Sequence, residues 1–329
     1  MTKQYTSLGL MSGTSCDGVD VSIIQSDGED QYLAVKDAYF EYEPSTKNKI
    51  LNLKEKINNI HDLKNHKKEL KLLEEKITVF HANAVKKTIK DCGVSVDFIG
   101  FHGQTIYHNS KEKISVQLGD GNLLAKLTKK KVVFNFRKND LDNNGEGAPL
   151  APIYHKLLVK QHNIQLPALI LNIGGISNFT LIEKKIDSLV FQSTDIGPGN
   201  CLIDEWIKKN SKENYDNNGS TAKSGKVNKI ILSKATKIWK KNIKSHHKKN
   251  QSFDTKDFDI SFLKGLSLKD GAATITEHTS QILADCINQF NKDIKVIICG
   301  GGRNNQFLIE KVSKKIKQNL QLIDIFKVN

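Results

Sequence analysis

Short apolar runs alternate with helical patterns along this chain, an order that is typical of α/β proteins. A turn rich in glycine, serine and threonine separates an apolar run at Tyr5–Leu10 from one at Val19–Gln25, which predicts two strands joined by a tight loop. From Leu70 to Ala84, apolar residues recur at three- and four-residue steps and predict a helix with one apolar face. Further strands are predicted at Tyr32–Glu41, Asp97–Phe101, Ile114–Leu118 and Val132–Phe136.

The pattern starts again after Pro149 and Pro152. The elements predicted beyond them are strands at Ala168–Ile173, Phe179–Ile182, Leu189–Phe191 and Val296–Cys299, a helix that begins near Asn200 and is capped by it, a loop at Asn210–Gly225 and a helix at Ala272–Phe290. A strand, a glycine-bearing turn and a returning strand occur at Leu8–Ile23 and again at Leu169–Leu181. This repetition, in a chain of 329 residues, predicts two α/β domains, at 1–136 and 137–329.

The formal net charge of +14 suggests an anionic partner such as a nucleic acid. Only two of the 50 basic residues are arginine, however, and base-reading and bidentate phosphate contacts favour arginine. The densest basic run, Lys234–Lys249, contains one tryptophan and no series of aromatic residues on which bases could stack. We therefore predict solvated lysines on helix faces and no nucleic-acid partner. The alternative is an anionic partner such as a nucleic acid, whose binding would depend steeply on salt.

No apolar run is long enough to cross a membrane, and the N-terminus lacks the apolar core of a secretory signal. The five cysteines are scattered, and none has the CxxC spacing of a zinc or redox site. The simplest interpretation is a protein of the reducing cytoplasm without a membrane partner.

The segment Met11–Asp20, MSGTSCDGVD, has the composition of a phosphate-binding turn. Its glycines allow tight backbone turns, whose exposed amides can cradle phosphate oxygens. Three hydroxyl side chains accompany them: Ser12, Thr14 and Ser15. Asp17 and Asp20 could hold a hydrated Mg²⁺, which usually takes one or two carboxylates. The alternative is a hairpin turn that binds no ligand.

Polar side chains follow one of the predicted strands of the first half. His102 and Gln104 lie where α/β proteins bind ligands, and with Asp120 they suggest a lip that binds a sugar or water. The alternative for His102 is a hydrogen-bonded core histidine.

Arg137 stands out in a chain that otherwise uses lysine, because only arginine offers a two-pronged fork to a carboxylate or phosphate. Its alternative role is an ion pair with Asp140.

The second half contains three glycine turns. Gly174 and Gly175, followed by Asn178, repeat the combination of strand, turn and polar side chain. Asp195 precedes a rigid Gly-Pro-Gly turn, where a general base is well placed, although an Asx-type turn is the alternative. The third turn consists of Gly300, Gly301 and Gly302. It lets a flat ring or a phosphate approach the backbone, and Arg303 follows it.

These motifs, in this order, resemble the anhydro-N-acetylmuramic acid kinase family of the actin/hexokinase/sugar-kinase superfamily. The matching segments are Met11–Asp20, Phe101–Thr105, Gln117–Asn122, Phe136–Pro152, Leu171–Asn178, Asp195–Asp204, Tyr215–Gly225 and Cys299–Asn305. The resemblance extends over essentially the whole chain. It implies an α/β, two-lobed actin/hexokinase-like (ribonuclease H-like) fold with duplicated mixed β-sheet domains around a cleft.

The family implies ATP-dependent phosphorylation of the sugar O6, coupled to hydrolytic opening of the 1,6-anhydro bridge of anhydro-N-acetylmuramic acid, with Mg²⁺. The product would be N-acetylmuramic acid 6-phosphate, formed in the cytoplasm during cell-wall recycling, and such enzymes are typically homodimers. By position, the segment Gly13–Asp20 corresponds to the family's ATP-binding segment. It includes Cys16, Gly18 and Val19. Asp195 corresponds to the catalytic base. We expect Arg137 to bind the lactyl carboxylate of the substrate.

Members of that family continue for about forty residues beyond the position of Asn329, in a helix that contributes to the cleft. This difference favours a second interpretation, a truncated and catalytically impaired member that binds nucleotide or sugar. A third interpretation is another carbohydrate kinase of the same superfamily, without bridge hydrolysis. Sugar-dependent turnover distinguishes the first interpretation from the second, and product analysis distinguishes it from the third.

Overall fold

The computed structural model describes residues 3–13, 15–186, 188–247, 253 and 255–326. The chain forms two compact units, Met1–Leu150 and Ala151–Asn329. The division lies later than the expected boundary near Arg137. The reason is that the Arg137 side chain bonds to His102 and Gly147, which ties it to the first unit.

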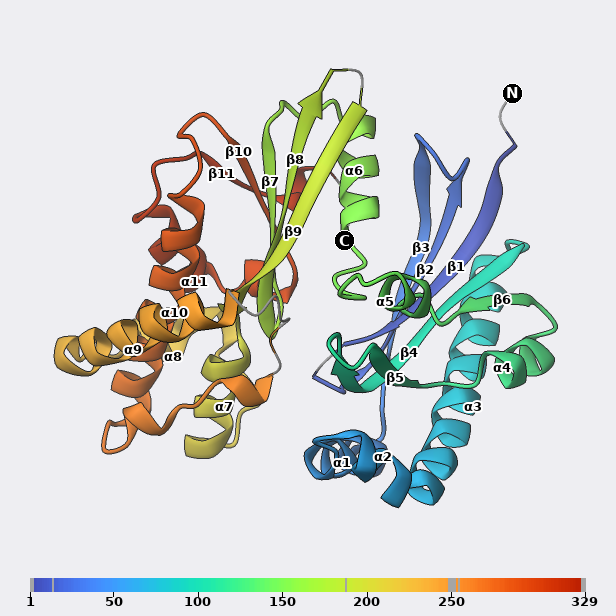
Figure 1. Ribbon diagram of the computed structural model, residues 1–329, viewed down its shortest axis with the longest axis horizontal. Helices are drawn as coiled ribbons and strands as arrows, with labels where there is room; N and C mark the ends of the chain where they lie inside the picture. Colours follow the sequence, from blue (N-terminus) through green and yellow to red (C-terminus); the bar gives the residue numbers. More distant parts are fainter. Residues whose placement is uncertain (1–2, 14, 187, 248–252, 254, 327–329) are drawn as a thin grey trace. The chain divides into compact units, whose positions relative to one another are not determined.

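The first unit contains one mixed sheet of six strands (Figure 1). The strands are β1 (Tyr5–Ser12), β2 (Gly18–Ser26), β3 (Tyr32–Glu41), β4 (Phe98–Asn109), β5 (Ile114–Leu118) and β6 (Lys131–Phe134). Their order is β3-β2-β1-β4-β5, and β6 also pairs with β4. β1 is antiparallel to β2 and parallel to β4. The helices are α1 (Pro44–Lys56), α2 (Ile60–Asn65), α3 (Lys67–Cys92), α4 (Gly121–Thr128) and α5 (Lys138–Asp142).

The second unit contains a mixed sheet of five strands (Figure 1). The strands are β7 (Ala168–Ile173), β8 (Ile176–Lys185), β9 (Ser188–Pro198), β10 (Lys295–Cys299) and β11 (Leu320–Leu322), in the order β11-β10-β7-β8-β9. The helices are α6 (Pro152–Gln161), α7 (Cys201–Asn210), α8 (Ser220–Lys223), α9 (Lys229–His247), α10 (Leu268–Ile287) and α11 (Gln306–Ser313).

The two sheets repeat one topology. In each, the first strand is antiparallel to the second, the second is antiparallel to the third, and the fourth lies parallel to the first on its other side. Parallel pairing requires a crossover, which the helices between β3 and β4 and between β9 and β10 provide. The repeat confirms the predicted duplication of mixed α/β units.

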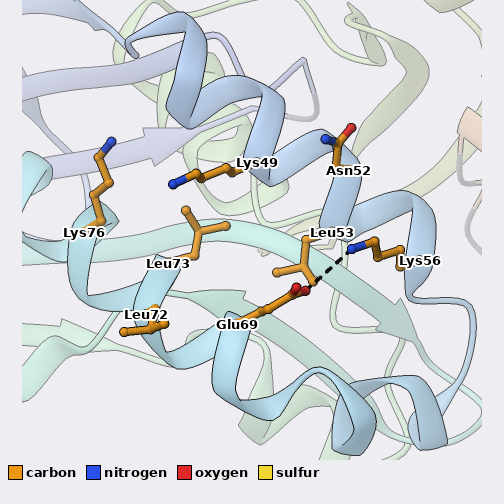
Figure 2. Close-up of a pocket in the computed structure, with 8 residues that line it drawn as sticks. All are labelled: Lys49, Asn52, Leu53, Lys56, Glu69, Leu72, Leu73 and Lys76. Carbon is orange, nitrogen blue, oxygen red and sulfur yellow. Dashed lines mark ion pairs between the residues drawn. The ribbon is translucent and has the colours of Figure 1, made fainter.

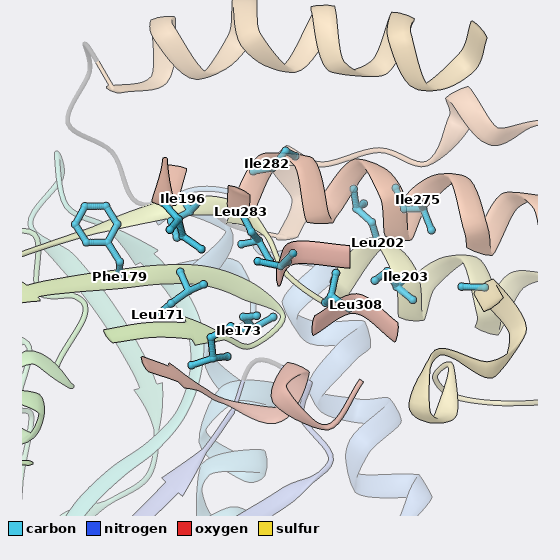
Figure 3. Packing of buried hydrophobic residues seen from close by; sticks show 14 of the residues in the cluster. Leu171, Ile173, Phe179, Ile196, Leu202, Ile203, Ile275, Ile282, Leu283 and Leu308 are labelled. Atoms are coloured by element: carbon cyan, nitrogen blue, oxygen red, sulfur yellow. The ribbon is translucent and has the colours of Figure 1, made fainter. Parts of the chain in front are cut away.

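The core of the second unit explains how its sheet is held. Strand β7 is apolar at almost every position, and Leu169, Leu171 and Ile173 have no exposed side-chain surface. They pack with residues of α7, α10 and α11, of which Figure 3 shows a part. On the other face of the sheet, His155 of α6 bonds to Thr180 of β8 at 2.8 Å. Both faces of the sheet are therefore covered by helices, as expected for parallel strands in α/β proteins.

Two of the predicted segments have other bounds or another structure than expected. The segment expected to be a loop at Asn210–Gly225 contains a short 3₁₀ turn and helix α8, because the carboxylate of Asp216 accepts hydrogen bonds from the amides of Thr221 and Ala222. The strand expected to reach Phe136 ends at Phe134, because Asn135 has a positive φ of 60° and turns the chain.

A surface cavity of about 360 Å³ lies between α1 and α3 in the first unit (Figure 2). The buried side chains of Leu53 and Leu73 form its floor. Its rim carries the exposed Leu72, lysines and Glu69, which pairs with Lys56 at 3.8 Å. No residue of the motifs identified in the sequence lines it.

Among the described residues, no helix has the length and apolar character that crossing a bilayer requires.

Candidate functional site

The first candidate is the turn between β1 and β2. These strands pair as far as Met11 opposite Asp20, so residues 13–17 form the connection. Cys16 has a positive φ of 58°, and its amide donates to the carbonyl of Gly13 at 3.2 Å. The side chains of Cys16 and Val19 are fully buried in the core, so only their backbones could face a nucleotide. Thr14, also expected in this segment, lies outside the described residues, and Ser15 is exposed.

Neighbouring elements fix the backbone of this turn. Gln104 is fully buried, and its amide nitrogen donates to the Gly13 carbonyl at 2.9 Å, so it supports the turn. Tyr42 donates its backbone amide to the Asp17 carbonyl at 2.8 Å. Gly18 must be glycine, because a Cβ there would lie 2.2 Å from the carbonyl oxygen of Phe40. These contacts fix the backbone on both sides of Thr14, at Gly13 and at Asp17–Gly18.

Two carboxylates accompany the turn. Asp17 forms an ion pair with Lys47 of α1. Asp20 lies on β2, and burial together with the neighbouring charge of Asp37 raises its pKa. A cation beside Asp20 would relieve that repulsion. Within the described residues, no group of three or more histidine, cysteine or acidic side chains could hold a metal ion by itself. One or two carboxylates with phosphate oxygens and water fit Mg²⁺, and Asp20 fits better than the already paired Asp17.

The structure joins His102 to Arg137. The Arg137 guanidinium reaches Nε2 of His102 with two nitrogens, at 3.2 and 2.8 Å, and the third bonds to the Gly147 carbonyl at 2.6 Å. Nδ1 of His102 lies 2.8 Å from the Gly103 carbonyl and therefore carries the proton. Burial, with the adjacent Arg137 charge, lowers the pKa of His102 to about 4. His102 thus accepts from Arg137 as a neutral ring at physiological pH.

Arg137 and Asp140 do not form the ion pair considered as an alternative. The carboxylate of Asp140 instead accepts the amide of Gly147 at 2.6 Å, while Arg137 holds the carbonyl of that same residue. Arg137 is half-buried, and burial lowers its pKa. Its partners among the described residues are a neutral ring and a peptide carbonyl, so its positive charge is not balanced by a bonded carboxylate.

The expected lip of His102, Gln104 and Asp120 is not joined by mutual hydrogen bonds in the described part of the chain. Asp120 is the N-cap of α4, where its carboxylate accepts from the amides of Asn122 and Leu123. Each of the three side chains has its own hydrogen-bond partner. The sequence suggested one common site for them and did not predict these separate roles.

In the second unit, β-sheet register places polar residues in one row. Asp195 on β9 is paired with Asn178 on β8, and Asn178 with Asn172 on β7. Cross-strand partners present their side chains on the same face of a sheet. The row ends at Cys299 of β10, immediately before the triple-glycine turn. Asn172 was not among the predicted site residues, although the same segment contains Gly174 and Asn178.

Asp195 is held in place from two directions. The backbone amide of Phe253 donates to its Oδ2 at 2.8 Å. Ile196, the next residue, is buried in the core of the unit, where Figure 3 shows it beside Leu283. The ring of Trp239 lies against Gly197 and contacts Phe253 with 5.7 Å between ring centroids. These contacts restrict the position of the carboxylate.

The turn at Gly174–Gly175 packs closely against the Gly-Pro-Gly turn that follows Asp195. The carbonyls of Gly174 and Gly175 accept the amides of Gly199, Asn200 and Cys201 at 2.8–3.1 Å. A Cβ on Gly199 would lie 2.3 Å from the Gly174 carbonyl oxygen. The prediction that the Asn200 side chain caps α7 is wrong, because backbone amides at this helix start are bonded to the glycine turn and Asn200 makes no side-chain cap.

The triple-glycine turn packs on the end of β7. A Cβ on Gly300 or Gly302 would lie 2.3 Å from side-chain atoms of Asn172 or Ile173, whereas a Cβ on Gly301 would meet nothing within 4 Å. Gly301 is therefore the position open to a ligand. The guanidinium of Arg303 bonds to the carboxylate of Asp324 at 3.1 and 3.2 Å, and to the Gly300 carbonyl at 3.2 Å.

Sequence comparison with known proteins gives a consistent result. The anhydro-N-acetylmuramic acid kinase family (AnmK) matches residues 5–325, a range that includes every motif described above. The chain is 50% identical to the protein named anhydro-N-acetylmuramic acid kinase of Pelagibacter ubique, over 100% of this chain and 88% of the relative. It is 35% identical to the protein of that name from Agrobacterium fabrum, over 95% and 84%. Component A of (R)-2-hydroxyglutaryl-CoA dehydratase of Acidaminococcus fermentans, a solved structure, is 11% identical over 97% of this chain and 91% of that chain, with a TM-score of 0.48.

Proposed function

Because this chain belongs to the anhydro-N-acetylmuramic acid kinase family, we propose that it is an ATP-dependent sugar kinase that converts 1,6-anhydro-N-acetylmuramic acid into N-acetylmuramic acid 6-phosphate. The observation that carries this proposal is the match over residues 5–325, which spans both units and all the candidate motifs. The same match supports an active kinase over a member that only binds nucleotide or sugar.

The reaction can be assigned to residues of this chain. Asp195 acts as the general base and takes a proton from the water that attacks the anomeric carbon, C1. The new C1–O bond replaces the bond from C1 to O6. The electron pair of the broken bond stays on O6, which attacks the γ-phosphorus of ATP and releases ADP. The hydrogen bond from Phe253 to Oδ2 of Asp195 fixes the carboxylate for the proton transfer.

The glycine turns are the proposed nucleotide contacts. We assign the ATP phosphates to backbone amides of residues 13–20 and to the turn at Gly174–Gly175, and the nucleoside to the backbone at Gly301, with Arg303 beside it. Asp20, with Asp17 as the second carboxylate, would hold Mg²⁺. When bound, this ion neutralises charge on the phosphate oxygens.

Arg137 is the proposed contact for the lactyl carboxylate of the sugar. Support comes from its bonds within the described part of the chain, which go to neutral groups, whereas Arg303 already has the carboxylate of Asp324. His102 holds two of the Arg137 nitrogens and so orients the fork. We also assign Asn178 and Asp140 to the sugar site. Asn178 is the cross-strand neighbour of Asp195. Asp140 accepts the amide of Gly147, whose carbonyl is bonded to Arg137.

Replacing Arg137 by lysine is expected to raise the KM for the anhydro sugar by about 10- to 100-fold, because a lysine cannot form two parallel bonds to a carboxylate. The measurement is kcat/KM with anhydro-N-acetylmuramic acid and with its lactyl-free analogue, anhydro-N-acetylglucosamine. Arg137→Lys should lose most of the preference for the lactyl sugar. Lys138→Gln, which removes the exposed neighbouring charge that pairs with Asp142, is the control. An unchanged preference in Arg137→Lys would exclude this role.

The reaction itself is tested with ¹⁸O-labelled water. Wild-type protein, Mg·ATP and the anhydro sugar should release ADP only when the sugar is present. The sugar phosphate should carry one ¹⁸O at C1 and none in the phosphate group. Phosphorylation without label at C1 would indicate another carbohydrate kinase chemistry, and no sugar-dependent ADP would contradict the proposal.

The family also leads us to propose that the protein is a homodimer that acts in the cytoplasm. Light scattering of the purified protein should give twice the monomer mass of 36.9 kDa. A monomer at micromolar concentration would contradict the dimer.

A further inference from the structure

Tyr42 contacts both ends of the first turn. It lies between the end of β3 at Glu41 and the start of α1 at Pro44, and it is 2% exposed. Its backbone amide donates to the Asp17 carbonyl at 2.8 Å, and its phenol oxygen lies 3.0 Å from Oγ of Ser12. One residue therefore brackets the whole connection between β1 and β2.

The donor and the acceptor of each side-chain hydrogen bond around Ser12 can be assigned. Nδ1 of His81 lies 2.8 Å from the Ile77 carbonyl, so this nitrogen donates. Nε2, 3.2 Å from the Ser12 hydroxyl, must then accept a hydrogen bond from it. Ser12 has no second proton to give, so Tyr42 donates to Ser12. Burial lowers the pKa of His81 to about 4, which keeps this ring neutral and the direction fixed at neutral pH.

Packing holds the rings of Tyr42 and His81 in place. The Tyr42 ring contacts Phe80 with 4.9 Å between centroids, and the His81 ring contacts Phe101 edge-on at 5.0 Å. Ser12 and His81 are buried as completely as Tyr42. The hydroxyl of Tyr42 is thus aligned by α3 and β4, elements that do not belong to the turn itself.

We propose that Tyr42 is a positioning residue for the nucleotide: through Ser12 and Asp17 it holds the turn in the shape in which its amides bind the ATP phosphates. This inference rests on the proposed function, because it assigns the phosphates to that turn. Amides that are ordered in advance bind an anion without the cost of arranging the loop. Without the phenol hydroxyl, part of that ordering has to occur on binding.

The test is Tyr42→Phe, which removes the hydroxyl and leaves the ring and the backbone bond to Asp17. The dissociation constant of ADP, measured by calorimetry without sugar, should rise about tenfold, and the KM for ATP should rise with it. The KM for the sugar should stay within about twofold. The matched control is Tyr107→Phe, which removes the hydroxyl that donates to Glu112 at 2.7 Å on the same sheet. It should leave ADP binding unchanged.

A double-mutant cycle separates positioning from a general loss of stability. Ser12→Ala should weaken ADP binding as Tyr42→Phe does. The double variant should bind ADP as tightly as the single variant with the lower affinity, since both substitutions remove the same bond. Unchanged ADP binding in Tyr42→Phe, even with a lower melting temperature, would overturn the proposal, and so would multiplicative effects. Wild-type protein that binds ADP but shows no sugar-dependent turnover would contradict the proposed function alone. Wild-type protein that binds no ADP would overturn both.

Discussion

Replacing Asp195 by asparagine is expected to lower kcat for the anhydro sugar by about three orders of magnitude, the contribution of a well-placed general base. Asparagine has nearly the same shape and keeps an oxygen for the hydrogen bond from Phe253, which reaches Asp195 at 2.8 Å. It cannot take the proton of the attacking water. The change should therefore affect the chemical step and leave the surrounding strand intact.

The measurement is sugar-dependent ADP release at saturating ATP and sugar. Binding of ADP should stay within about twofold of wild type, since the base does not touch the nucleotide phosphates in this assignment. Asp293→Asn is the matched control, because Asp293 is exposed and precedes β10. An Asp195→Asn enzyme with more than a tenth of the wild-type kcat would show that another group takes the proton.

Acidification from pH 7 to pH 5 is expected to reduce the free energy of unfolding by about 2 kcal/mol for each fully buried histidine. His81, His155 and His278 are at most 4% exposed, and burial lowers the pKa of each to about 4 from an ordinary 6.5. Between these two values the unfolded chain binds protons that the folded chain does not. Stability is therefore complete above about pH 6.5 and is lost as the pH falls toward 4.

Urea unfolding at several pH values between 7 and 5 measures this loss. Two of the three histidines lie in the second unit, so that unit should lose about 4 kcal/mol, a large part of a typical domain stability. His155→Gln, which can still bond to Thr180, should reduce the pH dependence of the second unit by about half. An equal pH dependence in wild type and His155→Gln would mean that His155 is not buried neutral in solution.

The sequence predicted the repeated strands and the glycine turns because their signals are local. Apolar alternation in Tyr5–Leu10 and Ala168–Ile173 and glycines at strand ends need no knowledge of distant residues. The same holds for the helix around Leu70–Ala84, which lies within α3. The order of the motifs was enough to identify the family, and the match over residues 5–325 confirms it.

Contacts across long sequence distances could not be predicted in this way. His81 lies on the buried face of α3, and nothing local shows that it accepts a hydrogen bond from Ser12, 69 positions away. The carboxylate of Asp324 holds Arg303 across 21 positions, and the amide of Phe253 holds Asp195 across 58. Hydrogen-bond partners depend on where the chain returns, and sequence periodicity does not contain that information.

The sequence alone thus determined that the chain has two α/β halves, which glycine turns and which aspartate, Asp195, are the chemical candidates, and the family to which they belong. Tertiary structure alone decided that Gln104 supports the first turn, that Arg137 is bonded to a neutral histidine, and that Tyr42 closes the turn between β1 and β2. Residue types and their spacing are properties of the chain itself. The protonation of a buried ring and the partner of a buried charge arise only when packing removes water and brings distant segments together.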